Sequence, residues 1–394
     1  MAALGVANET SVTTAPDTIR VMVVDDSAVI RGVLARWLED DPAIRVTATA
    51  ANGVGALRQV KAQTFDVVIL DIEMPEMDGM TALPQLLVAQ PGMQVLMAST
   101  LTARNADISL KALSLGAADY IPKPTSTRIV TSGVDFRREL VEKVKAIAQV
   151  ARRKRGETPV PSTAAPAPRP VVGVRSATPP PLPARAPASG GAIVHPRPSQ
   201  ARPAVLAIGS STGGPQALFN VLGALARPFP LPVLITQHMP PTFTAILAQH
   251  VERMTKHPAA EGQHDEVVRP GRVYIAPGDR HMTVRQAGGE VRIVLDDTPP
   301  QNFCRPAVDP LFRSVADVYG DKALAVVLTG MGHDGEQGAG AIIGRGGTVI
   351  AQDEATSVVW GMPGAVTRAG FASFVFPLNN IGGSITNLME GRQP

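Results

Sequence analysis

The stretch Ile19–Asp26, IRVMVVDD, is a mostly apolar run that ends in two aspartates, and it decides the fold of the first part of the chain. A helical pattern follows from Ser27. The alternation of apolar run and helical segment then repeats with IRVTATA, FDVVILD, VLMAST and DYIPK. Short apolar runs that alternate with helices are typical of buried parallel strands. Five such units predict a doubly wound parallel sheet.

The helices between these runs are expected from the spacing of their apolar residues. After the helix from Ser27, three more are expected near Gly53–Gln63, Thr81–Ala89 and Asn105–Leu115. A last helix is expected where four apolar residues recur at helical spacing, namely Phe136, Leu140, Val144 and Ile147. Residues 19–150 therefore form one predicted domain, preceded by an N-terminal extension over residues 1–18.

A second domain is expected over residues 203–390, where the same alternation resumes. Its apolar runs are AVLAIG, PVLITQ, RVYIAPG, VRIVL, ALAVVLTG, GTVIAQD and FASFVFP. The segment 272–295 differs because its strands are joined by Gly-rich turns, which predicts an antiparallel portion. The second domain is therefore predicted to be a doubly wound, mostly parallel α/β domain with an antiparallel part.

Residues 151–202 between the two domains are rich in Pro, Ala and Arg and poor in large apolar residues. Such a composition cannot bury enough surface to offset its ordering entropy, so a linker is predicted. This segment holds nine Lys/Arg and one acidic residue, while the whole chain carries only +3. The basic pI therefore belongs to the linker, which argues against a nucleic-acid-binding surface on the folded domains.

The compartment is indicated by the cysteine content and by the absence of targeting segments. The single cysteine, Cys304, cannot form an internal disulfide, which fits a reducing compartment. No basic flank leads into a long apolar stretch, and no apolar run approaches the length of a membrane span. We expect a cytoplasmic protein without membrane insertion.

Polar residues end four of the five runs in the first domain. Asp25 and Asp26 end the first, Asp71 the third, Ser99 the fourth and Lys123 the fifth. The carboxyl ends of parallel strands meet at one edge of a sheet, so we expect these side chains to converge. Three carboxylates repel one another unless a cation lies among them, and hard oxygen ligands suit Mg²⁺. Lys123 and Ser99 could then contact the oxygens of a phosphoryl group.

With DIEMPEMDG at Asp71–Gly79 and KP at residues 123–124, this arrangement resembles the receiver domain of two-component response regulators. The resemblance covers about residues 19–140 and implies a flavodoxin-like (βα)5 fold. It implies that Asp71 accepts a phosphoryl group from a chemotaxis histidine kinase, and that Ser99 and Lys123 sense it. The implied Mg²⁺ ligands are Asp25, Asp26, Asp71 and the backbone carbonyl of Glu73.

The second domain contains a small-residue turn, GSSTG, at Gly209–Gly213, directly after an apolar run. A phosphate-binding loop would need a lysine that this turn lacks, and the dinucleotide fingerprint GxGxxG does not match. The turn does match GxSxG, in which a sharp strand-to-helix turn exposes a serine hydroxyl. Ser211 holds the central position of the match, although Ser210 beside it is a second serine.

A nucleophilic serine needs a base within reach and a group that orients the base. His238 directly follows the run PVLITQ, and Asp334 lies in the Gly-rich loop after ALAVVLTG. Both are predicted at the same sheet edge as Ser211. Asp279, Asp309 and Asp353 compete with Asp334 for the orienting role. The polar contexts of four other histidines predict solvated side chains, namely His250, His257, His264 and His281.

The second domain contains five motifs in the order AIGSSTGGPQAL, ITQHMPP, YIAPGDRHM, RPAVDPLFRSVA and LTGMGHDG. Together they resemble the catalytic domain of the chemotaxis protein-glutamate methylesterase (CheB) family. The resemblance covers about residues 203–388. It implies a Ser211 nucleophile, a His238 base and an Asp334 orienting group, with backbone amides near Thr212 and Met331 as candidate oxyanion donors. It implies no cofactor for the esterase reaction itself.

The resemblance implies an enzyme that hydrolyses γ-glutamyl methyl esters on chemoreceptors, releases methanol and also deamidates receptor glutamines. It further implies that the unphosphorylated receiver obstructs the active site and that phosphorylation opens it. Two other output functions are compatible with a receiver domain: a DNA-binding domain, and a catalytically idle module that docks receptors. The absence of a helix-turn-helix pattern and the acidic balance of the folded parts count against the first.

Overall fold

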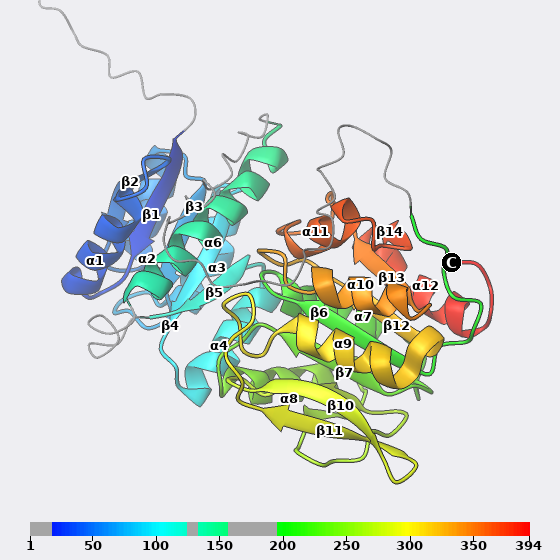
Figure 1. Cartoon of the computed structure of the whole chain (residues 1–394). Coiled ribbons are helices and arrows are strands. Elements are labelled where there is room, and N and C mark those ends of the chain that lie inside the picture. Colours follow the sequence, from blue (N-terminus) through cyan, green and yellow to red (C-terminus); the bar gives the residue numbers. More distant parts are fainter. Residues whose placement is uncertain (1–17, 124–132, 157–194) are drawn as a thin grey trace, which may run out of the picture.

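The computed structural model describes residues 18–123, 133–156 and 195–394 of the chain (Figure 1). Of the expected N-terminal extension (residues 1–18), it describes only residue 18. Of the expected linker (residues 151–202), it describes residues 151–156 and 195–202. Pro124 also lies outside the described residues. Within them, no helix combines the length and the apolar character needed to cross a bilayer.

The first domain is a five-stranded parallel sheet in the order β2-β1-β3-β4-β5, which confirms the predicted doubly wound fold. The strands are β1 (Ile19–Val24), β2 (Ile44–Ala50), β3 (Val67–Asp71), β4 (Gln94–Ser99) and β5 (Asp119–Pro122). The helices are α1 (Ala28–Glu39), α2 (Gly53–Ala62), α3 (Gly79–Ala89), α4 (Ala103–Ser114) and α6 (Gly133–Lys154).

The helices cover both faces of this sheet because alternate strand residues point to opposite sides. On β1, Val21 and Val23 pack with α1 and α6, whereas Met22 and Val24 pack with α2, α3 and α4. All four are fully buried. Side-chain caps start α1 to α4 as the sequence chemistry favours; the capping residues are Ser27, Asn52, Asp78 and Thr102.

The last helix of this domain extends further than predicted, to Lys154. Arg152 and Arg155, which were expected in the linker, form ion pairs with the buried carboxylate of Asp66. Burial of a carboxylate is costly without a cationic partner. These basic residues therefore belong to the folded domain.

The second domain is a seven-stranded sheet in the order β14-β13-β12-β6-β7-β9-β8, and every strand pair in it is parallel. Its strands are β6 (Val205–Ser210), β7 (Val233–Gln237), β8 (Ala259–Glu261), β9 (Val273–Ile275), β12 (Ala323–Val327), β13 (Thr348–Gln352) and β14 (Phe374–Phe376). The three-residue strand β8 has no apolar run and was not predicted.

Helices also cover both faces of the second sheet. One face packs against α7 (Gly214–Gly223), α8 (Phe243–Thr255) and α12 (Leu378–Met389). The other packs against α9 (Val308–Tyr319), α10 (Glu336–Gly344), α11 (Met362–Arg368) and the antiparallel hairpin of β10 (His281–Ala287) and β11 (Glu290–Asp296). A short 3₁₀ turn, Gly320–Lys322, precedes β12. The hairpin is the predicted antiparallel part, and β9 before it joins the parallel sheet.

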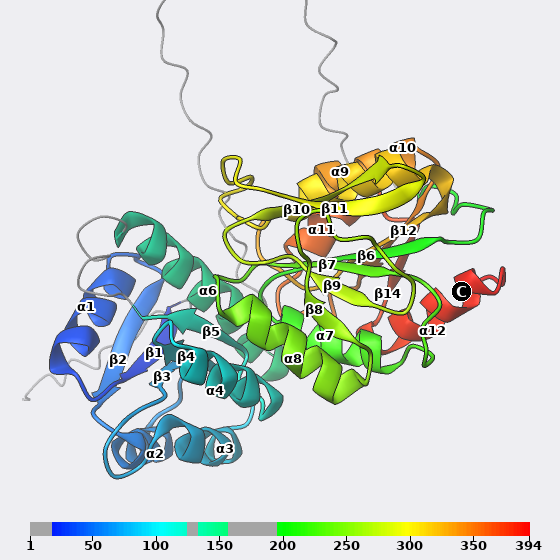
Figure 2. The same ribbon diagram turned by 90° about the horizontal axis from the view of Figure 1, so that it is seen from below.

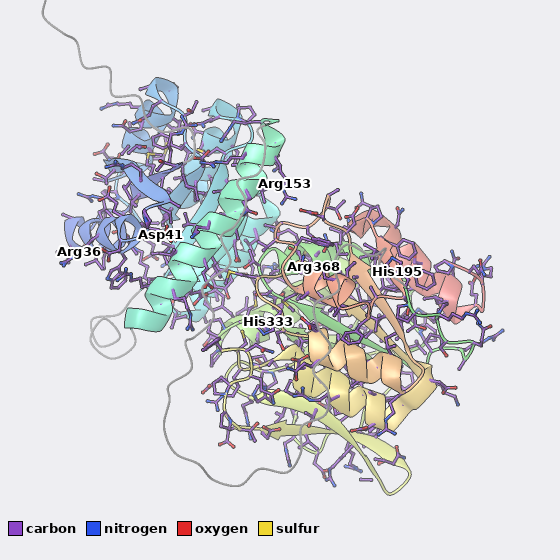
Figure 3. All side chains as sticks on the ribbon, turned by 45° about the horizontal axis from the view of Figure 1, so that its top comes forward. Arg36, Asp41, Arg153, His195, His333 and Arg368 are labelled. Carbon is purple, nitrogen blue, oxygen red and sulfur yellow. The ribbon has the colours of Figure 1, made fainter. Side chains whose placement is uncertain are left out.

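The two domains pack against each other, with α4 of the first domain beside α8 and α7 of the second (Figures 1 and 2). The ring of Tyr120 on β5 stacks on the ring of Phe243 at the start of α8, with centroids 4.5 Å apart. On the other side of the contact, Arg153 of α6 donates to the carbonyl of Glu354 at 3.3 Å (Figure 3). The first contact involves β5, whereas Arg153 lies beside Arg152 and Arg155, which pair with Asp66 just before β3.

Candidate active site

Ser211 lies in the turn between β6 and α7, at the carboxyl edge of the second sheet. Gly213 in this turn has a φ of +76°, a left-handed conformation that side chains other than glycine rarely adopt. The backbone N–H of Ser211 donates to the carbonyl of Thr329 at 3.1 Å, which ties the turn to the end of β12. The neighbouring Ser210 is fully buried and donates its hydroxyl to Oε1 of Gln237 at 2.7 Å. Of the two serines, only Ser211 is partly exposed.

His238 follows β7, the strand that pairs with β6. Its backbone N–H donates to the carbonyl of Ser210 at 3.1 Å, so the register continues into the turn that carries Ser211. The Nε2 atom of His238 lies 2.7 Å from Oδ2 of Asp334. The structure thus brings the predicted base and the predicted orienting carboxylate into hydrogen-bond contact beside Ser211.

Asp334 is 1% exposed, and protein donors hydrogen-bond both of its oxygens. The N–H of Val308 donates to Oδ2 at 2.6 Å, and the N–H of Asp309 donates to Oδ1 at 3.2 Å. These two amides open α9, whose N-terminal dipole favours a negative charge. The Asn302 side chain and the Gly335 N–H also donate to Oδ1.

The three competing aspartates have other partners. Asp309 accepts from Asn302 and from the N–H of Gly338. Asp279 pairs with Arg305, and Asp353 accepts hydrogen bonds from Thr356. Among the described residues, Asp334 is the carboxylate that contacts His238.

The charges of this pair are coupled. Burial raises the pKa of Asp334. The hydrogen bond with His238, the charge of His238 and the Val308 N–H outweigh this effect and lower the pKa to about 2. Burial lowers the pKa of His238, whereas the charge of Cys304, the hydrogen bond to Asp334 and that to Cys304 raise it to about 10. The Asp334 carboxylate therefore stays ionised, and the arrangement favours a protonated His238.

Cys304 contacts the second nitrogen of the imidazole, with its Sγ atom 3.3 Å from Nδ1 of His238. Since Nε2 is held by Asp334, Nδ1 is the nitrogen left to exchange a proton with the serine. Across the described residues, no hydrogen bond joins the Ser211 hydroxyl to His238. In this structure Cys304, rather than Ser211, is the residue that contacts Nδ1 of His238.

The two candidate oxyanion donors border Ser211. In the described part of the chain, the backbone N–H groups of Thr212 and Met331 form no hydrogen bond, so both can donate to a bound oxygen. Met331 follows Gly330, where a Cβ atom would lie 2.9 Å from the Cβ of Ser211. This close approach requires glycine at position 330. A pair of free N–H groups beside a serine can stabilise the oxyanion of acyl transfer.

The first domain gathers its predicted acidic residues at the carboxyl edge of its sheet. Ligand atoms of Asp25, Asp26 and Asp71 lie within 4.8 Å of one another. The Nζ atom of Lys123 bridges Oδ2 of Asp25 at 2.7 Å and Oδ2 of Asp71 at 2.6 Å. Burial, opposed by Lys123, raises the pKa of Asp71 to about 6. Asp25 and Asp71 are buried and Asp26 is exposed. Their clustered carboxylate oxygens are the hard ligands that a divalent cation prefers.

Ser99 is 1% exposed, and its hydroxyl is directed toward the backbone. It lies 3.2 Å from the carbonyl of Thr100 and 3.4 Å from that of Asn105 in α4. The exposed Glu73 follows in the loop after β3. The strand-end pattern thus located Ser99 correctly but could not predict the direction of its hydroxyl, which is a choice of rotamer.

Three of the four histidines expected in solvent are instead buried, namely His250, His257 and His281. Nε2 of His250 on α8 lies 2.7 Å from Oδ1 of Asp107 on α4, across the domain contact. Burial lowers the pKa of His250. For His250 the expectation failed because a polar sequence context cannot reveal a helix face that another domain covers. His257 and His281 are instead buried within the second domain, against the carbonyls of Leu222 and Pro299.

Comparison with known proteins agrees with both halves of this geometry. Residues 206–385 match the CheB methylesterase family, and residues 21–134 match the response regulator receiver domain. A protein-glutamate methylesterase/protein-glutamine glutaminase of Paramagnetospirillum magneticum is 53% identical over 96% of this chain and 98% of its own length. The chain belongs to the CheB methylesterase family. A CheB relative from Rhodopseudomonas palustris, with the same name, is 51% identical over 98% of this chain and 97% of its own length.

Two solved CheB structures from Thermotoga maritima resemble the separate domains. The CheB methylesterase catalytic domain is 42% identical, covers 48% of this chain and 100% of its own, and has a TM-score of 0.47. The response regulator domain of CheB is 35% identical, covers 36% of this chain and 99% of its own, and has a TM-score of 0.30. Membership of the CheB family disfavours a DNA-binding or catalytically idle output.

The loop before α9 contributes to the site but carries no strand-end pattern that predicts it. Asn302 and Cys304 contact Asp334 and His238, but the loop is not a strand end. The loop has unusual backbone conformation, since Asn302 and Phe303 both have positive φ. Residues in such strained conformations cluster at functional sites, but the strain cannot be read from the sequence.

Proposed function

We propose that this chain is a phosphorylation-controlled esterase that hydrolyses γ-glutamyl methyl esters on chemoreceptors to glutamate and methanol. The observation that carries the proposal is the 2.7 Å contact between His238 and Asp334 at the sheet edge beside Ser211. A buried carboxylate that holds one nitrogen of an imidazole leaves the other nitrogen to serve as a base. The family's relatives carry the name protein-glutamate methylesterase/protein-glutamine glutaminase, which supports this substrate class.

In the proposed mechanism, Nδ1 of His238 takes the proton of the Ser211 hydroxyl while Oγ attacks the ester carbonyl. The N–H groups of Thr212 and Met331 bind the oxyanion. The imidazolium gives the proton to the leaving methoxide. Methanol departs, and a γ-glutamyl ester remains on Ser211. His238 then activates water, which releases glutamate. A glutamine side chain follows the same path with ammonia as the leaving group. The chain supplies the nucleophile, the base and the oxyanion donors, and solvent supplies the water.

The receiver would control access to this site. The receiver contacts two segments of the second domain that lie beside His238. One contains Phe243, which stacks on Tyr120 and follows His238 closely in the chain, and the other contains Cys304, which contacts the His238 ring. The guanidinium of Arg138 on α6 lies 4.1 Å from the ring centroid of Phe303, the residue before Cys304. In Figure 3, His333 next to the catalytic Asp334 lies on the edge of the second domain that faces the receiver. The proposed resting state is therefore the docked one.

Phosphorylation of Asp71 would weaken this docking. Asp25, Asp26 and Asp71 with the carbonyl of Glu73 would hold Mg²⁺, which shields the charge of an incoming phosphoryl group. Lys123 and the Ser99 hydroxyl would then bind the phosphoryl oxygens. The Ser99 hydroxyl now faces the backbone of α4, so its rotation alters the helix that carries Asp107 to the docking surface. The histidine kinase of a chemosensory system would supply the phosphoryl group.

Methanol release from a methylated chemoreceptor, measured with and without a small-molecule phosphodonor, tests the proposed function. We expect release in both conditions and a faster rate with the phosphodonor. A protein that releases no methanol in either condition contradicts the proposal.

Replacement of Asp107 by asparagine is expected to raise the basal esterase rate about fivefold. The change removes the charge that faces the buried His250 and weakens docking of the two domains by about 1 kcal/mol. The ratio of undocked to docked protein then rises about fivefold. Asp41→Asn is the matched control, since Asp41 pairs with Lys145 on the side of α6 turned away from the second domain (Figure 3). An equal increase in both variants would contradict the docking role of Asp107.

Replacement of Cys304 by serine or alanine is expected to move the acid limb of the kcat/KM profile to lower pH. The Cys304 charge raises the pKa of His238, and the enzyme needs the neutral imidazole. Loss of that contribution lowers the pKa of His238, so the neutral base form persists at lower pH. A limb that stays in place or moves to higher pH in both variants would rule out this effect.

A further inference from the structure

Asn302 lies between two buried carboxylates in the loop that precedes α9. Its Nδ2 atom donates to Oδ1 of Asp334 at 2.9 Å and to Oδ2 of Asp309 at 3.0 Å. Asp309 is 2% exposed and Asp334 is 1% exposed, so little water separates their charges. Two carboxylates in such a position repel each other, and one of them tends to hold a proton.

We propose that Asn302 is a positioning residue of the esterase, which keeps Asp334 ionised with Oδ2 directed at His238. The proposal rests on the triad of the proposed function. The Asn302 amide carries two N–H groups, and one goes to each carboxylate. Within the described residues, Asn302 is the one side chain besides His238 that hydrogen-bonds Asp334. Asn302 thus holds Oδ1 together with the N–H groups of Asp309 and Gly335, and Oδ2 is left to His238 and the N–H of Val308.

A purely structural role for the amide does not account for this geometry. Backbone hydrogen bonds of 2.8 and 3.1 Å between Gln301 and Cys304 close the loop without help from the Asn302 side chain. The φ of Asn302 is +51°, a conformation that asparagine, aspartate and glycine tolerate better than other residues. The loop can therefore keep its shape when the amide is removed, provided that the new residue accepts this conformation.

The electrostatics of the pair agree with this role. Burial and the charge of Asp334 raise the pKa of Asp309, whereas hydrogen bonds from Gly338 and Asn302 oppose the shift. Asn302 also helps to lower the pKa of Asp334. Without the amide, the two carboxylates would take up a proton at higher pH. His238 would then lose the charge that orients it and stabilises its imidazolium form.

The test uses the full-length protein with a phosphodonor present, so that receiver docking does not limit the rate. Asn302→Gly removes the amide and accepts the positive φ, and Asn302→Asp keeps the shape of the side chain but removes both donors. In both variants we expect kcat for methanol release to fall about 10- to 100-fold, because a buried charge loses its donor. KM should remain within about twofold, since the amide is not directed at the substrate. The acid limb of the kcat profile should move to lower pH, because a partly protonated Asp334 raises the pKa of His238 less than the ionised carboxylate does. The downfield proton resonance of His238 Nε2–H should shift or disappear.

Asp309→Asn supplies a rescue that a structural role would not produce. In the Asn302→Gly background it removes the second charge and offers a new amide beside Asp334. We expect the double variant to regain part of kcat and to return the acid limb toward its original position. If the losses of kcat in the two single variants simply add in the double variant, the proposal is overturned.

An unchanged kcat and pH profile in both Asn302 variants, or an effect confined to KM, would also overturn it. If Asn302→Gly fails to fold, Asn302→Asp carries the test. Failure of the underlying triad gives a different result, because turnover would then persist in Ser211→Ala. A normal rate in Asn302→Gly, in an enzyme whose turnover depends on Ser211, contradicts the role of Asn302 alone.

Discussion

Replacement of Ser211 by alanine is expected to lower methanol release by a factor on the order of 10⁴ to 10⁶, because loss of a triad nucleophile removes the covalent path. The His238–Asp334 contact and the free N–H groups of Thr212 and Met331 would remain, so substrate binding should persist. Covalent labelling by a fluorophosphonate, followed by mass spectrometry of the labelled peptide, gives a second measurement. The wild-type protein should carry the label on residue 211, and the variant should carry none.

Ser210→Ala is the matched control, because the two serines are adjacent in GSSTG and only one is predicted to react. Ser210 is fully buried and its hydroxyl is donated to Gln237, which holds the Ser211 carbonyl through Nε2 at 2.9 Å. Its loss should cost some stability but leave labelling in place. Labelling that survives in Ser211→Ala and disappears in Ser210→Ala would reverse the assignment. Labelling that survives in both would refute a serine nucleophile in this turn.

The sequence could predict the parts of the site that follow from sheet geometry. Ser211, His238 and Asp334 follow β6, β7 and β12, and β6 pairs with both of the other strands. Because neighbouring parallel strands end at one edge, three residues far apart in the chain had to converge there. The same reasoning located the acidic cluster and Lys123 of the receiver.

The remaining features depend on packing that no periodic pattern encodes. Cys304 lies 66 residues from His238 in the chain, and His250 lies 143 residues from Asp107. Neither contact joins strand ends. The first depends on an irregular loop with left-handed residues, and the second depends on how two separate domains dock. A sequence read one domain at a time predicts each sheet but not the surface that the domains share.

Replacement of Asp71 by asparagine is expected to abolish phosphorylation completely, because an amide cannot take the place of the nucleophilic carboxylate. The esterase rate of the variant should be the same with and without a phosphodonor, and basal methanol release should be retained. Incorporation of labelled phosphate and parallel methanol assays provide the measurements. A variant that a phosphodonor activates as well as the wild type would refute the switch at Asp71.

Thermal denaturation shows whether the variant loses its response through the switch or through misfolding. The pKa of Asp71 is raised to about 6 in the folded protein, so the folded state binds this proton more tightly than the unfolded chain. Its stabilising contribution is present below the unfolded pKa near 3.8 and is lost as the pH rises through about 6. At neutral pH the ionised carboxylate therefore destabilises the receiver, and asparagine should stabilise it by about 1–3 kcal/mol. An Asp71→Asn protein that melts at a higher temperature, yet ignores the phosphodonor, separates the chemistry of phosphorylation from the integrity of the fold.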